Sequence, residues 1–382
     1  MKCAFLFAVA LSLFSACGSR NLYKQTKLEN PPLERGYVYS TRQTAIEAGV
    51  DPVEFTSPVV TKDTVFVASE TNGLEALERT SFRRKWSFNV KNGVSGDPVL
   101  SGGTVYFGAN DGNFYALDAE FGRVLWKYET KVPVYARPHV ADKRVYIMAS
   151  DDVIYALDQE TGKWIWHYKR GGDYITTVRG NATPISHDGR VFAGFSDGYF
   201  VALDAKDGNL KWEQKIHKGT KFTDVDATPL IDGERVYISS YDGELYALQK
   251  QTGKVIWHID VGGSKRVVVD DKTLYLGASN GRVYSINKDT GRIGWSFELD
   301  QGTPSNLVQH ENYLAFGSSQ QYFYVIHKGD GSLAYRYNVG LRSGFFSTPT
   351  QSGNEIFVLS NFGNLYVFKW SGAGAHSSTR VN

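Results

Sequence analysis

Cysteine is nearly absent from this 382-residue chain, which contains only Cys3 and Cys17. Cys3 falls within an N-terminal apolar segment that we expect to be removed, so the remaining chain cannot form an internal disulfide. For an exported protein, this scarcity means that stability has to come from packing and from closure of the fold rather than from cross-links.

Net charge and long apolar runs are also scarce. The 42 Lys and Arg residues nearly balance the 40 Asp and Glu residues, and no basic stripe with interleaved aromatic residues occurs, so the sequence does not predict a nucleic-acid partner. Beyond the N-terminus, no apolar stretch approaches the roughly 18 residues of a membrane-spanning helix, so any membrane attachment is expected to be through lipid.

The sequence shows no pattern of a catalytic or metal site. Its eight histidines are scattered singly, without the spacing of metal ligands. No Ser/His/Asp pattern and no glycine-rich phosphate loop is found. We therefore expect no bound metal, no cofactor and no enzymatic activity.

The N-terminus has the composition of an export signal. A mainly apolar run of 11 residues from Ala4 to Phe14 is followed by Ser15-Ala16-Cys17. Such a run is too short to cross a bilayer as a helix, so residues 1–16 are predicted to be a signal peptide. Small residues before a cysteine resemble a lipoprotein cleavage box, with Phe14 where leucine is usual. This predicts lipidation of Cys17; secretion after cleavage at an Ala-type site is the alternative.

One unit is repeated through the rest of the chain. Two stretches rich in β-branched and aromatic residues, Thr104–Ala109 and Asn113–Leu117, are joined by Asn110-Asp111-Gly112. That junction predicts a β-hairpin, because its turn needs the positive φ that Gly and Asn tolerate. A second turn, from Asp118 to Gly122, leads into a third strand that contains Trp126.

The tryptophan of this unit recurs at a regular spacing. Its counterparts are Trp86, Trp166, Trp212, Trp257 and Trp295, with Tyr335 in the seventh unit. The gaps of 40, 40, 46, 45, 38 and 40 residues lie near the ~40–45-residue period of propeller blades with four strands each. We expect these side chains to pack between blades, where burial of each contributes roughly 2–3 kcal/mol. The first unit is degenerate, because Phe82 stands where the others have glycine.

The two ends of the repeat region complement each other. Tyr37–Thr44 has the pattern of a strand that belongs to no complete unit, and the last unit lacks an outer strand, which would leave a sheet edge unpaired. We therefore expect Tyr37–Thr44 to complete the last blade, with Tyr39 in the tryptophan position. The sequence predicts an all-β fold: an eight-bladed β-propeller of four-stranded antiparallel blades at 36–370, preceded by a tether at 17–35 and followed by a flexible tail at 371–382.

The third and fourth gaps exceed the others by about five residues, and the additional length falls in the links Arg170–Ala182 and Lys215–Ala227. Both links are expected on the rim that carries the hairpin turns, and elongated neighbouring loops are where repeat proteins usually bind partners. The first link carries Arg179 and the second carries Asp224 and Asp226. Two interpretations stay open: an Arg179–carboxylate bridge between blades, or a polar contact patch for a partner.

These segments resemble a known family. Val178-Arg179-Gly180 before Pro184, Asp224-Val225-Asp226 before Thr228-Pro229, and Ser343-Gly344-Phe345 in the last blade are similar to the BamB family. That family consists of lipoproteins of the outer-membrane β-barrel assembly machinery, within a wider group of quinoprotein-like repeat propellers. The resemblance covers the whole chain after the predicted signal peptide.

The resemblance implies a non-catalytic scaffold of the Bam complex that docks onto the periplasmic domains of BamA. It would assist the folding and insertion of outer-membrane proteins. It would be held by its N-terminal lipid at the periplasmic face of the outer membrane, and be monomeric outside the complex. By the same resemblance, the docking surface would consist of Thr176, Val178, Arg179, Asp224 and Asp226.

Two other classes of protein stay open. Quinoprotein dehydrogenases share the repeat and carry pyrroloquinoline quinone beside Ca²⁺, but they are expected to be much longer and to contain adjacent cysteines, which this sequence lacks. A propeller that binds cell-wall glycans or peptides through its central mouth could use exposed aromatic residues such as Tyr174, Phe222 or Phe345.

Overall fold

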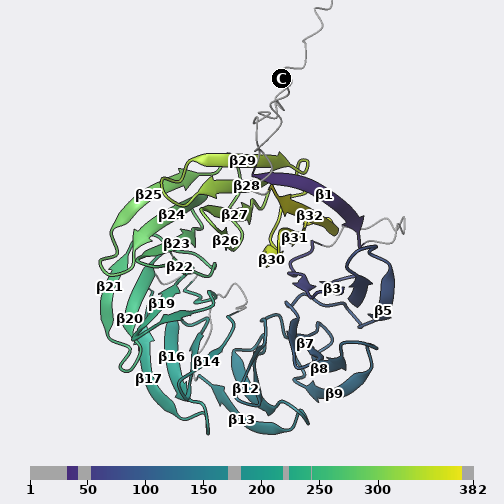
Figure 1. The fold of residues 1–382 in the computed structure, drawn as a ribbon. Coiled ribbons are helices and arrows are strands. Elements are labelled where there is room, and N and C mark those ends of the chain that lie inside the picture. The colour runs from purple at the N-terminus through teal and green to yellow at the C-terminus, as the bar shows by residue number, and fades with distance from the viewer. Residues whose placement is uncertain (1–31, 42–52, 171–181, 218–222, 242, 372–382) are drawn as a thin grey trace, which may run out of the picture.

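The computed structural model of the chain describes residues 32–41, 53–170, 182–217, 223–241 and 243–371. All regular secondary structure in these ranges is β-strand, arranged as eight four-stranded antiparallel sheets around a common axis (Figure 1). Within them, nothing forms a helix of the length and apolarity that a membrane span requires. The eight-bladed β-propeller predicted from the sequence is confirmed.

Each blade begins with a short inner strand near the axis. The inner strands of blades one to eight are β2 (Val59–Val60), β6 (Val99–Ser101), β10 (His139–Ala141), β14 (Ile185–His187), β18 (Leu230–Asp232), β22 (Val268–Asp270), β26 (Val308–His310) and β30 (Thr350–Ser352). The second strands are β3 (Thr64–Ser69), β7 (Thr104–Gly108), β11 (Arg144–Met148), β15 (Arg190–Gly194), β19 (Arg235–Ser239), β23 (Thr273–Gly277), β27 (Tyr313–Gly317) and β31 (Glu355–Leu359).

The other two strands of each blade lie farther from the axis. The third strands are β4 (Gly73–Glu78), β8 (Asn113–Asp118), β12 (Val153–Asp158), β16 (Tyr199–Asp204), β20 (Leu245–Gln249), β24 (Arg282–Asn287), β28 (Tyr322–His327) and β32 (Asn364–Trp370). The outer strands are β5 (Arg84–Phe88), β9 (Val124–Glu129), β13 (Trp164–Lys169), β17 (Leu210–Lys215), β21 (Val255–Ile259), β25 (Ile293–Glu298), β29 (Leu333–Asn338) and, in blade eight, β1 (Leu33–Ser40).

The unit around residue 110 folds as its turn residues predict. Gly112, in the hairpin turn, has a φ of 81°, and Gly122, in the turn before the outer strand, has a φ of 69°. The carboxylate of Asp118 accepts hydrogen bonds from the backbone N–H groups of Glu120 at 3.1 Å and Phe121 at 2.8 Å. Local turn chemistry therefore sets the strand boundaries of the repeat.

The apolar core is divided among the eight interfaces between neighbouring blades. Each interface has its own cluster of buried side chains, contributed by the facing strands of two blades. Between blades two and three, for example, Tyr106 and Phe114 pack with Val145 and Ile147. Each blade is consequently stabilised by its two neighbours rather than by one central core.

Six of these interfaces share a contact made by the repeated tryptophan. Each indole Nε1–H donates a hydrogen bond, at 3.0 to 3.1 Å, to a backbone carbonyl of the next blade: Trp86 to Ala119, Trp126 to Gln159, Trp166 to Ala205, Trp212 to Lys250, Trp257 to Lys288 and Trp295 to Lys328. Each ring also lies against a turn glycine at which an added Cβ would come within 2.4 to 2.9 Å: Gly122, Gly162, Gly208, Gly253, Gly291 and Gly331. The prediction that the tryptophans pack between blades is confirmed.

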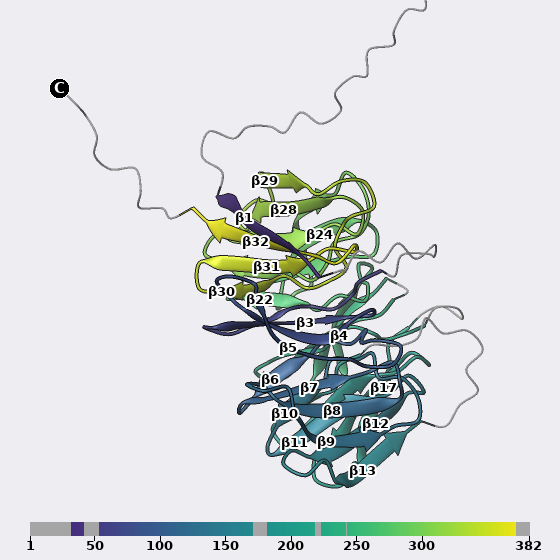
Figure 2. The ribbon, with the colours of Figure 1, turned by 90° about the vertical axis from the view of Figure 1, so that its right-hand side faces the viewer.

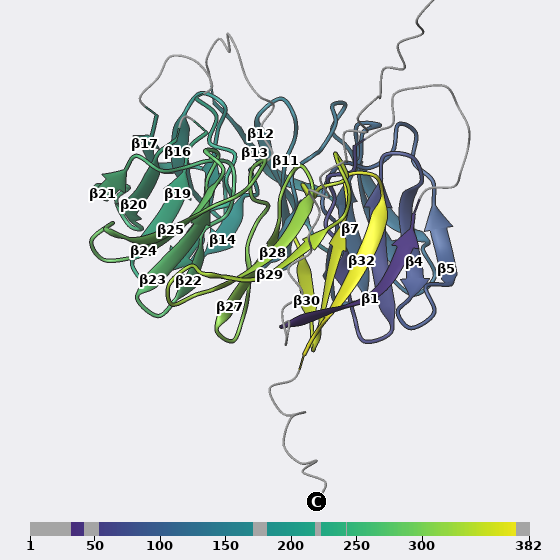
Figure 3. The ribbon, with the colours of Figure 1, turned by 90° about the horizontal axis from the view of Figure 1, so that it is seen from above.

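The N-terminal strand closes the ring. β1 pairs antiparallel with β32, between Leu33–Ser40 and Asn364–Trp370, and the two strands lie side by side in Figures 2 and 3. The prediction of a shared last blade is confirmed. The strand begins earlier than the predicted Tyr37–Thr44, because pairing continues through a bulge between Arg35 and Val38; residues 42–44 lie outside the described residues.

The interface between blades eight and one has a different contact in place of tryptophan on glycine. Phe82 occupies the turn position at a φ of 55°, and the ring of Tyr39 stacks on it with centroids 5.8 Å apart. In the tryptophan interfaces, the indole ring occupies the space beside the turn glycine. Here the Phe82 side chain fills that space. Phe82 stands in place of the turn glycine and Tyr39 in place of the outer-strand tryptophan, and the two replacements compensate each other because their rings pack together.

Candidate functional site

Both links that the sequence singles out belong to one rim of the ring. Because strands alternate in direction, each outer strand ends on the rim where the next inner strand begins, and the hairpin turns between second and third strands lie there too. We call it the link rim. Segments 171–181 and 218–222 lie outside the described residues, and so do three of the predicted docking residues: Thr176, Val178 and Arg179.

The described part of the second link is fixed against the hairpin turns of two blades. The Tyr241 N–H of blade five donates to the Asp224 carbonyl at 2.9 Å, and the Val225 N–H donates to the Phe195 carbonyl of blade four at 3.2 Å. The backbone of Thr223–Asp226 is therefore held on the link rim, as the sequence predicts.

The two carboxylates of this segment differ in exposure. Asp224 is 0% exposed, whereas Asp226 is half-buried. Asp226 also acts on Lys265, in the link before blade six. Burial lowers the pKa of Lys265, and the negative charge of Asp226 opposes part of this lowering. The sequence treats the two residues as equivalent parts of a surface, but only Asp226 presents its side chain there.

Arg170 forms a charged cluster that sequence reasoning missed. It follows β13, where the first link begins, and its Nε donates to Asp197 Oδ2 at 2.7 Å. Its Nη1 donates to the Glu213 carboxylate, and the guanidinium lies 4.1 Å from the ring centroid of Tyr199. Burial disfavours the charged form, but both carboxylates outweigh it and raise the pKa of Arg170. A fixed cation thus joins blades three and four.

Asp152 is a second residue that the sequence did not single out. It stands in the hairpin turn of blade three at a φ of 60°, where several other blades have glycine. Its carboxylate accepts hydrogen bonds from the Ser196 N–H at 3.2 Å and hydroxyl at 3.1 Å. Burial raises the pKa of Asp152 to about 6; the bonds from Ser196 oppose this, and the charges of Asp197 and Asp224 add to it.

The link rim of blades three to five therefore carries charged side chains that are held in place, several of them buried. Acidic residues from three blades lie there around one paired guanidinium, Arg170. Such a surface suits electrostatic recognition of a protein partner, which gains specificity from charges held in place. Across the described ranges, no group of three or more His, Cys, Asp or Glu side chains could hold a metal ion.

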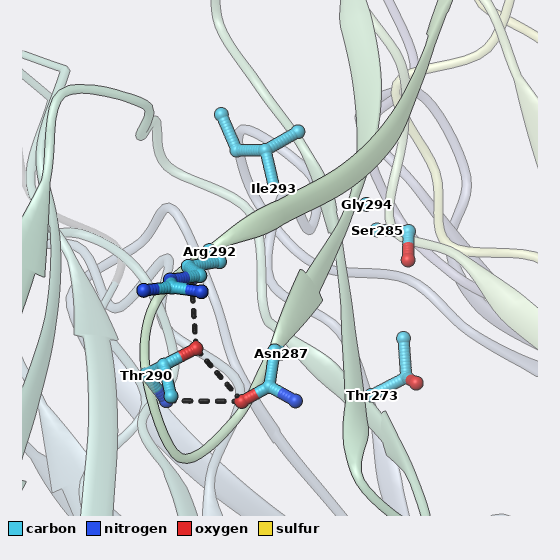
Figure 4. Close-up of a pocket in the computed structure, with 7 residues that line it drawn as sticks. All are labelled: Thr273, Ser285, Asn287, Thr290, Arg292, Ile293 and Gly294. Carbon is cyan, nitrogen blue, oxygen red and sulfur yellow. Dashed lines mark hydrogen bonds between the residues drawn. The ribbon is translucent and has the colours of Figure 1, made fainter.

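A shallow pocket of about 400 Å³ lies on the opposite rim, in blade six (Figure 4). Its lining residues are Thr273, Ser285, Asn287, Thr290, Arg292, Ile293 and Gly294. The Thr290 N–H and hydroxyl both donate to Asn287 Oδ1 at 3.0 Å, as Thr161 does to Asp158 in blade three. These polar groups form the repeated turn, so we assign no binding role to the pocket.

The expectation that Phe345 is an exposed aromatic residue is wrong. Phe345 is 0% exposed, because its ring packs between blades seven and eight against Phe323, at 5.8 Å between centroids, and Tyr366, at 5.7 Å. The other two candidates for glycan binding, Tyr174 and Phe222, lie outside the described residues.

Comparisons with known proteins extend over most of the ring. A family model described as "Outer membrane protein assembly factor BamB" matches residues 37–134, 76–297 and 279–379. The outer membrane protein assembly factor BamB of Shewanella oneidensis is 28% identical over 163 residues, and the match spans 41% of this chain and 41% of that curated relative.

The solved structures that resemble the fold include a BamB and a dehydrogenase. BamB from Moraxella catarrhalis superposes with a TM-score of 0.76 at 21% identity, covering 88% of this chain and 100% of that one. A quinohemoprotein alcohol dehydrogenase from Comamonas testosteroni superposes with a TM-score of 0.69 at 15% identity, covering 91% and 78%. At these identities, both likenesses show the propeller fold alone.

Proposed function

The chain belongs to the family of the outer membrane protein assembly factor BamB, and from this premise we propose that it is a scaffold for outer-membrane protein assembly. It docks through the link rim of blades three to five onto the periplasmic domains of BamA, within the Bam complex. Its role is to assist the folding and insertion of outer-membrane proteins by binding, not by catalysis.

The charged surface on the link rim is the observation that carries this proposal. The family model matches residues 37–379 with no interruption between its segments, and the two links that lengthen the third and fourth tryptophan intervals both begin and end on this rim. The Arg170 cluster and the Thr223–Asp226 segment are both anchored to hairpin turns. Charges anchored in this way need little ordering when a partner binds, which favours affinity.

The predicted docking residues have different roles in this proposal. Asp226 is half-buried, and its exposed part contacts the partner directly. Asp224 is buried, so it acts by holding its segment in position. Arg179, with Thr176 and Val178, supplies the basic and apolar part of the surface from the first link.

The membrane anchor is a separate part of the proposal. Residues 1–16 act as the signal peptide, and lipid on Cys17 holds the propeller at the periplasmic face of the outer membrane. A Cys17→Ser variant should lose incorporation of radiolabelled palmitate and leave the membrane fraction. Retention of label in that variant would mean that another residue carries the lipid.

Charge reversal on the link rim tests the docking surface. We expect Asp226→Arg and Arg179→Glu to abolish co-purification with BamA while leaving the free energy of unfolding within about 1 kcal/mol of the parent. The matched control is Asp63→Arg, an exposed aspartate on the opposite rim, which should leave co-purification unchanged.

The outcomes separate a docking surface from a structural bridge. If either link-rim variant unfolds, the residue contributes to a bridge between blades. If both variants stay folded and still bind BamA, the assigned surface is wrong. Loss of binding in the Asp63 control as well would mean that net charge, not position, decides the interaction.

A quinoprotein-type enzyme is the second candidate, because the fold resembles a quinohemoprotein dehydrogenase. The described residues supply no group of His, Cys, Asp and Glu side chains for a metal beside a quinone, so we propose no chemistry of that kind. Mixing the protein with pyrroloquinoline quinone and Ca²⁺ should give no bound chromophore; a stoichiometric absorbance spectrum would favour the enzyme.

A further inference from the structure

The residue two positions before each inner strand is polar in all eight blades. We call these residues the axial ring; they are Ser57, Asp97, Arg137, Thr183, Thr228, Arg266, Asn306 and Thr348. Because the inner strands surround the axis (Figure 1) and all begin on the link rim, the axial ring encircles the axis on that rim.

Five neighbouring members hydrogen-bond to one another in order. The Arg266 N–H donates to Asn306 Oδ1 at 2.8 Å, and Asn306 Nδ2 donates to Thr348 Oγ1 at 2.8 Å. The Thr348 N–H donates to Ser57 Oγ at 2.8 Å, and the Ser57 N–H donates to Asp97 Oδ1 at 2.6 Å. The backbone around this arc is thereby fixed, and the Asp97 carboxylate already accepts a bond within it.

Arg137 and Arg266 are the two basic members, and both are exposed. They belong to blades three and six of eight, so they lie on different sides of the axis, three blade steps apart. Surrounding protein lowers the pKa of Arg266, and the positive charge of Arg137 lowers it further. The pKa of His139, which is lowered chiefly by burial, also falls in response to both guanidinium groups. The two cations therefore share one electrostatic environment.

Neither arginine has a carboxylate partner within 4 Å among the described residues, in contrast to other arginines of the propeller. Those that do pair with Asp or Glu include Arg79, Arg170, Arg235, Arg282 and Arg336. Lys265 precedes Arg266 in the chain; burial lowers its pKa and so disfavours its charged form, and the negative charges of Asp97 and Asp226 oppose this. Within the described ranges, Arg137 and Arg266 are thus basic members of the axial ring that no carboxylate pairs with.

We propose that the axial ring binds a compact, polyvalent oxyanion, carboxylate or phosphate, between Arg137 and Arg266. A guanidinium presents paired N–H donors in the geometry that both groups accept, and such charge-assisted hydrogen bonds are among the strongest in proteins. Two like charges held near each other repel, and an anion between them converts this repulsion into two attractions. The site lies on the same rim as the proposed docking surface, and Asp226 of that surface acts on Lys265, but anion binding does not depend on the proposed function.

The anion can come from two sources: a free small molecule, or acidic side chains of a bound polypeptide. Isothermal titration of the full-length protein in mild detergent distinguishes them, using citrate, inorganic phosphate and a glutamate-rich peptide as probes. The variants are Arg137→Gln, Arg266→Gln and the double variant. Arg292→Gln is the matched control, since Arg292 is an exposed arginine on the opposite rim.

Each single variant should weaken binding of the active probe about tenfold or more, and the double variant should abolish it, as expected for loss of a charge-assisted contact. Binding of citrate or phosphate supports a free anion, and binding of the peptide alone supports an acidic polypeptide. Arg137→Lys keeps the charge but loses the paired donors, so it should bind more weakly than the parent and more tightly than Arg137→Gln.

A thermal readout guards against variants that misfold. The active probe should raise the melting temperature of the parent and of the Arg292→Gln control, but not that of the double variant. The proposal is overturned if none of the three probes binds the parent, or if the control loses affinity as much as the axial variants do.

Discussion

Replacing Asp152 by asparagine is expected to stabilise the protein at neutral pH. The residue is 6% exposed, and burial raises the pKa of its carboxyl group from 3.8 to about 6. The folded state therefore holds the proton more tightly than the unfolded chain does. Stability consequently falls as the pH rises from about 3.8 to about 6, and the loss is complete above pH 6. At roughly 1.4 kcal/mol per unit, the full cost is about 3 kcal/mol.

Asparagine can keep the contacts of Asp152 without its charge. Its Oδ1 can accept the Ser196 N–H, and its Nδ2 can donate to the Ser196 hydroxyl, which accepts as readily as it donates. Asparagine also tolerates the φ of 60° at this position. We therefore expect Asp152→Asn to gain about 1–3 kcal/mol at pH 7.5.

Urea denaturation at pH 7.5 and pH 4.0 measures this effect. The advantage of Asp152→Asn should shrink to below about 1 kcal/mol at pH 4.0, where the parent carboxyl group is protonated in the folded state. Asp204→Asn is the matched control with the opposite sign. A hydrogen bond from Lys211 lowers the pKa of Asp204, so this variant should be less stable than the parent at pH 7.5. A less stable Asp152→Asn at pH 7.5, or an advantage independent of pH, would refute the reasoning.

Two further predictions concern the interfaces between blades. Gly208→Ala should destabilise the fold by about 2–4 kcal/mol, because a Cβ at a φ of 77° would lie 2.7 Å from the Trp166 ring; thermal unfolding measures the loss, and an unchanged melting temperature would contradict the close contact. A double-mutant cycle of Tyr39→Ala and Phe82→Ala, measured on the free energy of unfolding, should give a coupling energy of about 0.5–1.5 kcal/mol. Additive effects would show that the stacked rings do not stabilise the interface between blades eight and one.

Most of the fold could be predicted because its determinants are local. A turn such as Asp118 to Gly122 specifies its own geometry, and seven recurrences fix the period regardless of any single departure. The contact between Tyr39 and Phe82 could not be predicted in the same way. Each residue is recognisable as a departure from the repeat, but only closure of the ring brings them together.

The candidate site was less predictable, since its contacts cross from blade to blade. The sequence places Arg170 and Asp197 in neighbouring segments, but it does not show that their side chains meet. The raised pKa of Asp152 depends on its burial among turns of neighbouring blades, which no local pattern describes. The axial ring did leave a signal, because its members precede a proline in six of the eight blades, and that recurrence could have been found.

Because the core is divided among eight separate interfaces, the closed ring can open at one of them while the other seven stay packed. If one interface between blades opens, every sheet keeps all its strands, and the open ring keeps seven of its eight interfaces. Two interfaces lack the indole contact of the six tryptophan interfaces, and of these the one between the last and first blades has the smaller buried cluster, so we expect opening to begin there. The ring could then widen without any blade unfolding. In that case the amide hydrogens of β1 would exchange with solvent before those of blade four, on the other side of the ring.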